Sequence, residues 1–153
     1  MVRRKWQGDP SCHLCNATED RNHLFFSSPV IKAGWGIVAI CLGATNVLGS
    51  IDQYWVWINK WFPNGKQVHT FGLAAICWAI WKTRNRSCFQ GKKVKHPAEL
   101  VIYACSFMQF WAGLYKQDYQ AQMVEGINTL LSMASRIMVG QRREVPRNLL
   151  MAA

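Results

Sequence analysis

Two cysteines and a histidine near the start of the chain have the types and spacing needed to bind a metal ion. Cys12 and Cys15 are separated by two residues, and His23 follows Cys15 after seven more. Two thiols at this spacing can bind one ion through a tight turn, and an imidazole on the next element can supply a third ligand. Zinc takes four ligands in a tetrahedron, so the pattern predicts three quarters of a zinc site.

The fourth ligand of this predicted site stays open from the residues alone. His13, Asp20, Cys41 from the following helix, or a water molecule could complete the tetrahedron. The alternative is a decayed site with two free thiols and a surface histidine. Metal binding drives the folding of such small Cys/His segments, so the loss of one thiolate should cost much of the affinity.

The residues around these ligands resemble a known family. The Cys-x-x-Cys pair is followed by an acidic residue, Glu19, then by His-Leu-Phe-Phe at residues 23–26, and after a short gap by Trp35. This order resembles the zinc-binding region C-terminal to the reverse transcriptase of plant non-LTR retrotransposons. In that family a cysteine usually stands two residues after His-Leu-Phe-Phe. This chain has Ser28 there, and a serine hydroxyl keeps its proton near neutral pH, unlike a zinc-binding thiol.

A second segment resembles the same family. Residues 78–85 read Trp-Ala-Ile-Trp-Lys-Thr-Arg-Asn and are followed by Phe89. They are similar to the Trp-x-x-Trp-Lys-x-Arg-Asn-x-x-x-Phe segment of those proteins, and the two motifs together cover residues 12–89. The resemblance implies a zinc-binding fragment whose polymerase would lie upstream.

The charge of the chain favours a polyanionic partner. Lys and Arg total 18 against 8 Asp and Glu, a net charge of +10, which is typical of proteins that bind nucleic acid or an anionic surface. Residues 82–95 contain six basic side chains and no acidic one. We interpret them as a phosphate-binding footprint for RNA or DNA, the alternative being a solvated helix end: Lys82, Arg84, Arg86, Lys92, Lys93 and Lys95.

Catalysis has little support in the sequence. The 8 carboxylates are scattered, and none are paired as a two-metal polymerase or nuclease site requires. A Tyr-x-Asp-Asp motif, a Gly-rich phosphate loop and a nucleophile elbow are all missing. We therefore expect no enzyme activity and no small-molecule substrate.

Cysteine usage indicates a reducing compartment. No apolar signal segment follows the basic N-terminus, and Cys41, Cys77, Cys88 and Cys105 sit in or beside apolar helical patterns. Free buried thiols are expected there, in a protein of the nucleus or cytoplasm.

Helical periodicity predicts an all-α fold of about four to five helices behind the Cys/His segment. Ser27 or Ser28 caps a helix with Pro29 at its first position, Ser50 or Asp52 begins a second, and residues 67–86 form a third. A fourth starts at Pro97, with a break near residues 116–118 before the last, which continues to about residue 139. The expected divisions are a disordered basic lead (1–11), the knuckle (12–28), the helical domain (29–139) and a basic tail (140–153).

Apolar stripes predict which faces of these helices are buried. Trp78 and Trp81 lie near one face of the third helix, and Trp111 lies on the stripe of the fourth, so we place all three in the core. The short connection makes these two helices antiparallel neighbours, with Trp111 packed against residues 74–81. Trp55, Trp57 and Trp61 cannot all face inward from one helix, so one is expected at the surface.

Two other classes of function remain open from the sequence. Residues 33–51 are 19 positions without a charge. Together with residues 67–81 and 100–115, they would suit a small membrane-associated helical protein, which is the second class. Gly43 to Gly49 is more typical of a helix end and turn than of a membrane interior. The third class is a translated relic without a selected function.

Overall fold

The computed structural model describes residues 10–61 and 65–144 of the 153-residue chain. Its elements follow one another as a π-helical turn, η2 (His23–Ser27), and the helices α1 (Pro29–Cys41), α2 (Ile51–Trp61), α3 (Lys66–Gln90), α4 (Pro97–Ala112) and α5 (Gln117–Glu144). Within the described residues no strand forms, and only an isolated bridge joins Ser11 and Thr18. The predicted all-α fold, with a Cys/His segment ahead of the helices, is confirmed.

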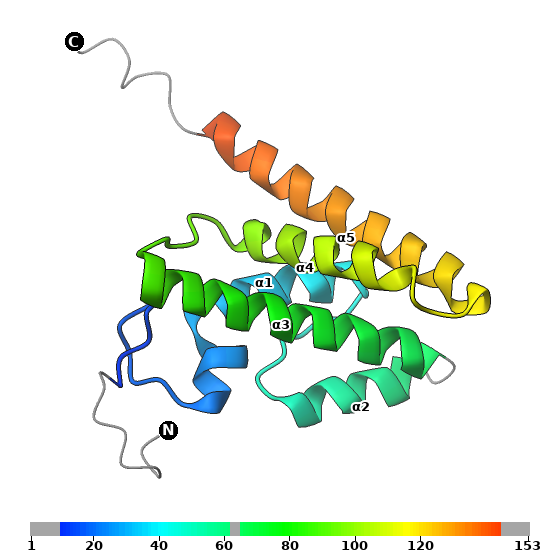
Figure 1. Cartoon of the computed structure of the whole chain (residues 1–153), viewed down its shortest axis with the longest axis horizontal. Coiled ribbons are helices and arrows are strands. Elements are labelled where there is room, and N and C mark those ends of the chain that lie inside the picture. Colours follow the sequence, from blue (N-terminus) through cyan, green and yellow to red (C-terminus); the bar gives the residue numbers. More distant parts are fainter. Residues whose placement is uncertain (1–9, 62–64, 145–153) are drawn as a thin grey trace.

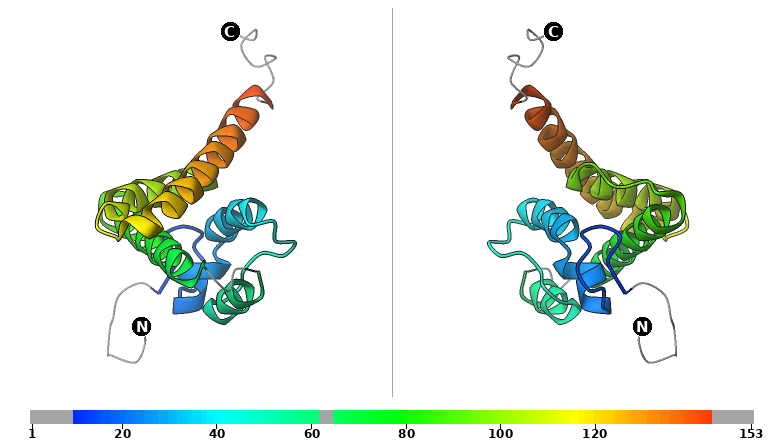
Figure 2. Two further views of the ribbon diagram at one scale, coloured as in Figure 1. Left: turned by 90° about the vertical axis from the view of Figure 1, so that its right-hand side faces the viewer. Right: turned by 90° about the vertical axis from the view of Figure 1, so that its left-hand side faces the viewer.

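Helix α4 is the centre of the fold. It contacts α3, α5 and α1, while η2 contacts α1 and α3. Figure 1 shows α3 and α4 side by side, with α5 running obliquely above α4 and α2 below α3. In the two side views the C-terminal end of α5 rises away from the other helices (Figure 2). The buried residues of all these elements form one continuous hydrophobic core.

Local capping chemistry marks several of the helix boundaries that the sequence predicts. Gln53 N–H donates to the Ser50 hydroxyl at 3.3 Å ahead of α2, and Ala98 N–H donates to Nδ1 of His96 at 3.0 Å ahead of α4. Gly91 ends α3 with a left-handed φ of 64°, a conformation that glycine adopts without strain. Helix α5 continues to Glu144, beyond its predicted end near residue 139.

The uncharged run over residues 33–51 is not one helix. Helix α1 ends at Cys41, Gly43 turns the chain with a φ of 66°, and α2 begins only at Ile51. The predicted turn near Gly43 is therefore confirmed. None of the helices that the structure describes is long and apolar enough to cross a membrane.

The buried face of α3 differs from the predicted one. Small side chains at four-residue spacing line that face, and they are Ala75, Ala79, Thr83 and Ser87, with Ile76 and Ile80 beside them. Trp78 and Trp81 are each 42% exposed, so their predicted place in the core is wrong. Apolar residues surround α3 on all sides, so periodicity did not identify its buried face. The small residues let neighbouring helices approach closely, and that geometry keeps the indoles at the edge.

The predicted pairing of α3 with α4 is confirmed, but the place of Trp111 is corrected. Trp111 is half-buried, stacks on Phe107 with ring centroids 5.8 Å apart, and meets Phe71 edge-on at 6.4 Å. It therefore lies at the edge of the core and not inside it, and it contacts the N-terminal part of α3 through Phe71. On α2, Trp57 is buried and Trp55 half-buried, while the side chain of Trp61 lies outside the described part.

Candidate metal centre

A tight turn holds the two cysteines of the candidate centre. Cys12 N–H donates to the carbonyl of Ala17 at 2.7 Å, and Asn16 N–H donates to the carbonyl of Cys12 at 2.7 Å. Asn16 has a φ of 64°, in the left-handed region that asparagine tolerates better than most residues. The turn brings Cys12 and Cys15 to the same side of the segment.

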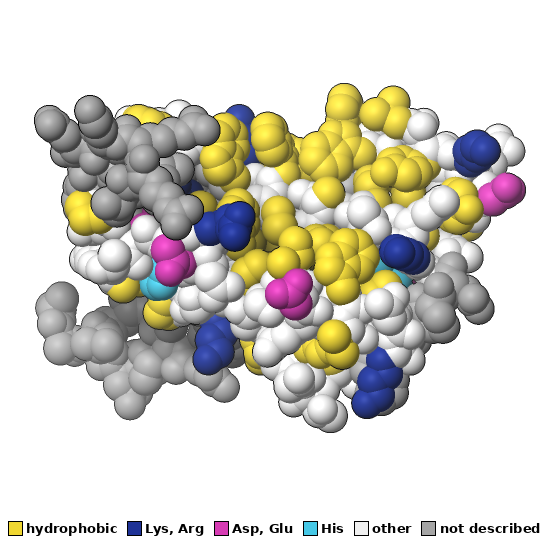
Figure 3. Space-filling view, turned by 90° about the horizontal axis from the view of Figure 1, so that it is seen from below, with side chains coloured by type: hydrophobic (Ala, Val, Ile, Leu, Met, Phe, Trp, Pro, Cys, Tyr) yellow, Lys and Arg dark blue, Asp and Glu magenta, His cyan; other side chains and the backbone are white. Residues whose placement is uncertain are grey.

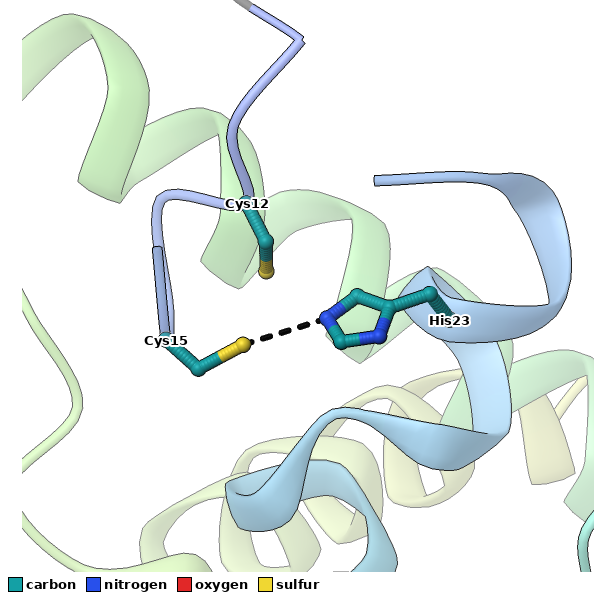
Figure 4. Close-up of side chains that lie close together, drawn as sticks. All are labelled: Cys12, Cys15 and His23. Carbon is teal, nitrogen blue, oxygen red and sulfur yellow. Dashed lines mark hydrogen bonds between the residues drawn. The ribbon is translucent and has the colours of Figure 1, made fainter. Parts of the chain in front are cut away.

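The imidazole comes from the element that follows. Oδ1 of Asp20 accepts a hydrogen bond from His23 N–H at 2.6 Å and so caps the helical turn from its N-terminus. The ring of His23 points at the cysteines, with Nε2 3.1 Å from Sγ of Cys15 (Figure 4). The ligand atoms of Cys12, Cys15 and His23 all lie within 4.8 Å of one another. These three residues are therefore close enough to hold one metal ion.

The donors suit a borderline-soft cation. Two sulfurs and one ring nitrogen are donors that suit zinc better than they suit hard cations such as magnesium or calcium. Sγ of Cys12, which is fully buried, accepts a hydrogen bond from Leu14 N–H at 3.4 Å. Burial raises the pKa of the Cys12 thiol above its ordinary value, and the Leu14 N–H opposes this only in part. A cation bound between the sulfurs would supply the charge that a buried thiolate needs.

Ser28 has an unusual environment for a serine. It stands at the N-cap position of α1, with Pro29 following, but its hydroxyl makes no capping bond. Its side chain is fully buried, and Oγ has no hydrogen-bond partner. An unpaired buried hydroxyl costs roughly 1–3 kcal/mol. The Ser28 N–H donates to the carbonyl of His23 at 2.9 Å, so the backbone of Ser28 is tied to that of a candidate ligand.

The other candidates for a fourth ligand do not join this cluster in the described part of the chain. In that part of the chain, the group of ligand atoms that lie within 4.8 Å of one another consists of Cys12, Cys15 and His23. It does not include His13, Asp20 or Cys41. The Asp20 carboxylate is used in capping. Cys41 ends α1, and burial raises the pKa of its thiol.

The knuckle is fastened to the C-terminal part of α3. Arg84 donates from Nη2 to Oε1 of Glu19 at 2.9 Å and from Nε to the same oxygen at 3.2 Å. The two side chains are only 13% and 10% exposed. Ser87 adds a hydrogen bond from its hydroxyl to the carbonyl of His13 at 3.0 Å. The two motifs that carry the family resemblance are thus in direct contact, although 65 positions separate Glu19 from Arg84.

Trp35 fastens the other side of the same segment. It is almost fully buried in α1, and its indole Nε1 donates to the carbonyl of Phe25 at 2.8 Å. Its ring stacks on Phe26 at a centroid distance of 5.7 Å. The spacing of His-Leu-Phe-Phe to Trp35 therefore reflects packing that holds η2 against α1.

The six predicted phosphate-binding residues separate into three groups. Arg84 is the structural partner of Glu19. Lys82 and Arg86 lie over aromatic rings, with Lys82 Nζ 5.9 Å from the centroid of Trp78 and the Arg86 guanidinium 5.7 Å from that of Tyr103. The third group, Lys92, Lys93 and Lys95, is exposed on the connection between α3 and α4. The position of Tyr103 under Arg86 was missed from the sequence, where Tyr103 carried no motif signal.

Comparison with known proteins finds no matching family model, no matching curated protein and no matching solved structure.

Proposed function

We propose that this chain is a non-catalytic, nucleic-acid-binding fragment that resembles the zinc-binding region next to a retroelement reverse transcriptase of plants. Zinc bound by Cys12, Cys15 and His23 would have a structural role. Ser28 stands at the sequence position where the family usually has the fourth thiolate. The observation that carries the proposal is the convergence of three donor atoms within 4.8 Å. The contact between the two motifs, through Glu19 and Arg84, adds support.

Metal analysis tests the zinc part of the proposal. Protein purified without chelator should contain close to one zinc per chain by elemental mass spectrometry, and Cys15→Ser should lose it because a thiolate ligand is removed. Cys88→Ser is the matched control, because Cys88 is also a half-buried free thiol but is outside the cluster. Parent protein without stoichiometric metal would contradict zinc binding.

The nucleic-acid part rests on the net charge of +10 and on the exposed lysines of the connection between α3 and α4. Each phosphate contact with a single strand adds about 0.7 to the slope of log affinity against log salt. Neutralising Lys92, Lys93 and Lys95 together should therefore weaken binding of single-stranded RNA or DNA and lower that slope by about 2.

A second triple variant controls for the change in net charge. Lys32 on α1, Lys66 at the start of α3 and Lys116 between α4 and α5 are also exposed. They lie away from the α3–α4 connection, and their neutralisation removes the same charge. It should leave the slope nearer to that of the parent. Equal effects of the two triple variants would mean that the protein binds through its overall charge and not through the α3–α4 connection.

A further inference from the structure

A row of aromatic side chains follows the boundary between α3 and α4. We define the aromatic row as Trp81, Trp78, Phe107, Tyr103 and Trp111. Trp81 stacks on Trp78 at a centroid distance of 5.3 Å and an angle of 24°. Trp78 meets Phe107 edge-on at 6.5 Å, and Phe107 in turn contacts Tyr103 at 4.7 Å and Trp111 at 5.8 Å.

The row reaches the surface at its α3 end. Trp78 and Trp81 are each 42% exposed, whereas Tyr103, Phe107 and Trp111 are half-buried. Two stacked indoles at a surface leave a large apolar area in water, which costs free energy unless a partner covers it. Because the inner members of the row pack into the core, the exposed pair is held in a fixed orientation.

Basic side chains are interleaved with this row. Lys82 lies over Trp78, and Arg86 lies over Tyr103. Arg86 and Tyr103 also line a hollow of about 80 Å³ together with Lys92, Lys93 and one acidic residue, Glu99. In the view from below, hydrophobic side chains form a band on the surface with Lys and Arg beside it and fewer Asp and Glu (Figure 3). Aromatic rings alternating with cations match a chain of bases and phosphates better than they match an apolar protein surface.

We propose that the aromatic row is the binding site for a single-stranded nucleic acid, with an unpaired base stacked on the Trp81–Trp78 pair. Lys82, Arg86, Lys92 and Lys93 then contact the phosphates on either side. Stacking needs the face of a base, which a duplex keeps covered, so the site selects single strands. This inference rests on the proposed nucleic-acid binding and specifies where and how it takes place.

Substitution of Trp81 tests the stacking contact. Trp81 ends the row and packs against Trp78, so its removal leaves the core contacts of Phe107 and Trp111 in place. Trp81→Ala should weaken binding of a fluorescent oligothymidylate about 5-fold or more in an anisotropy titration. A loss of about 5-fold is the low end of the effect expected when one stacked ring is removed. Trp81→Phe keeps an aromatic face and should recover most of the affinity.

Two controls separate stacking from charge and from misfolding. An abasic oligonucleotide of equal length carries the phosphates without the bases, and its affinity should be the same for parent and Trp81→Ala. Trp55→Ala removes a half-buried tryptophan of α2 that contacts Tyr54 and is not a member of the row, and it should leave oligothymidylate binding unchanged. Circular dichroism melts check that each variant is folded.

The outcomes distinguish this inference from the function on which it rests. Equal binding of oligothymidylate by parent and Trp81→Ala, or equal binding of thymidine-bearing and abasic strands by the parent, would overturn the aromatic row as the base site while nucleic-acid binding stands. Preference of the parent for duplex over single strand would overturn it as well. A parent that binds none of these probes would remove both the inference and the proposed nucleic-acid binding.

Discussion

Ser28 is the residue to test as the fourth position of the candidate metal centre. It is fully buried without a hydrogen-bond partner, in a segment whose backbone is bonded to that of His23. A thiolate at this position would bring the ligand set to Cys₃His, which is one of the structural zinc sets. Ser28→Cys should therefore raise zinc affinity by more than about tenfold and stabilise residues 12–35. A competition titration with a metallochromic chelator measures the affinity.

Ser27 provides the matched control for that variant. It is the adjacent residue and has the same side chain, but it is exposed and its hydroxyl donates to the carbonyl of Asn22. Ser27→Cys should bind zinc as the parent does. If the two cysteine variants have equal affinities, Ser28 does not stand at the fourth vertex.

The half-buried thiol of Cys77 and the buried thiol of Cys105, both outside the centre, should be chemically quiet. Burial raises the pKa of Cys77 to about 11 and, more strongly, that of Cys105 to about 12, from an ordinary 9.0. At pH 8 Cys77 then holds roughly 100-fold less thiolate, the reactive form, than an ordinary thiol. Alkylation with iodoacetamide, followed by peptide mass spectrometry, should modify both residues far more slowly in the native protein than in denaturant. Equal rates for Cys77 in the two conditions would mean that its side chain is not in this environment.

The three candidate ligands could be predicted from the sequence, but the contacts that hold their segment against the helices could not. Cys12, Cys15 and His23 are close in the chain, so a local turn is enough to bring them together. The partners Glu19 and Arg84 stand 65 positions apart, and no local rule pairs them. The buried state of Ser28 likewise depends on the packing of η2 against α1 and α3.

At the scale of elements, two glycines inside helices have opposite surroundings. Gly126 lies in α5 with no atom within 4 Å of an added Cβ, whereas a Cβ on Gly34 of α1 would lie 3.1 Å from Cδ2 of Leu100 on α4. Gly126→Ala should stabilise the protein by about 0.5–1 kcal/mol because alanine restricts the unfolded chain and favours the helix. Chemical denaturation measures the change in the free energy of unfolding, provided that parent and variant have the same m-value.

Gly34→Ala gains the same helix propensity but tightens the contact between α1 and α4. The gain should be offset by this crowding, so the variant should be at least about 0.5 kcal/mol less stable than Gly126→Ala. Equal stabilisation by the two substitutions would show that α1 and α4 do not approach closely at Gly34.

Helix boundaries were predictable because they depend on local chemistry, but the buried faces were only partly so. Ser50, His96 and Gly91 act through neighbouring backbone groups, which a sequence shows directly. The buried face of α3 instead follows from small residues such as Ala79, which allow close approach. Large apolar residues dominate a periodicity argument, and for this reason Trp78 and Trp81 were assigned to the core although they form the exposed end of the aromatic row.

For the whole molecule, the central question is how the knuckle and the helical body depend on each other. They are joined by the pair of Glu19 and Arg84, by the bond from Ser87 to His13, and by the packing of Trp35. Figure 1 shows the knuckle, in dark blue, beside the C-terminal end of α3. If metal binding orders the knuckle, then these contacts should transmit part of that stabilisation to the body, because folding and binding are linked.

A double-mutant cycle on Glu19 and Arg84 tests this connection. Both side chains are mostly buried, so either Glu19→Gln or Arg84→Gln leaves the other charge with a poorer partner, at a cost of about 1–3 kcal/mol. The double variant should lose less free energy of unfolding than the sum of the two single losses, with a coupling energy of about 0.5–3 kcal/mol by chemical denaturation.

Each single variant should also weaken zinc binding, because the knuckle is then less well ordered. Glu125→Gln, at an exposed site on α5, is the control and should change neither quantity. Additive single costs, or single variants that bind zinc as tightly as the parent, would show that the knuckle folds independently of the helices.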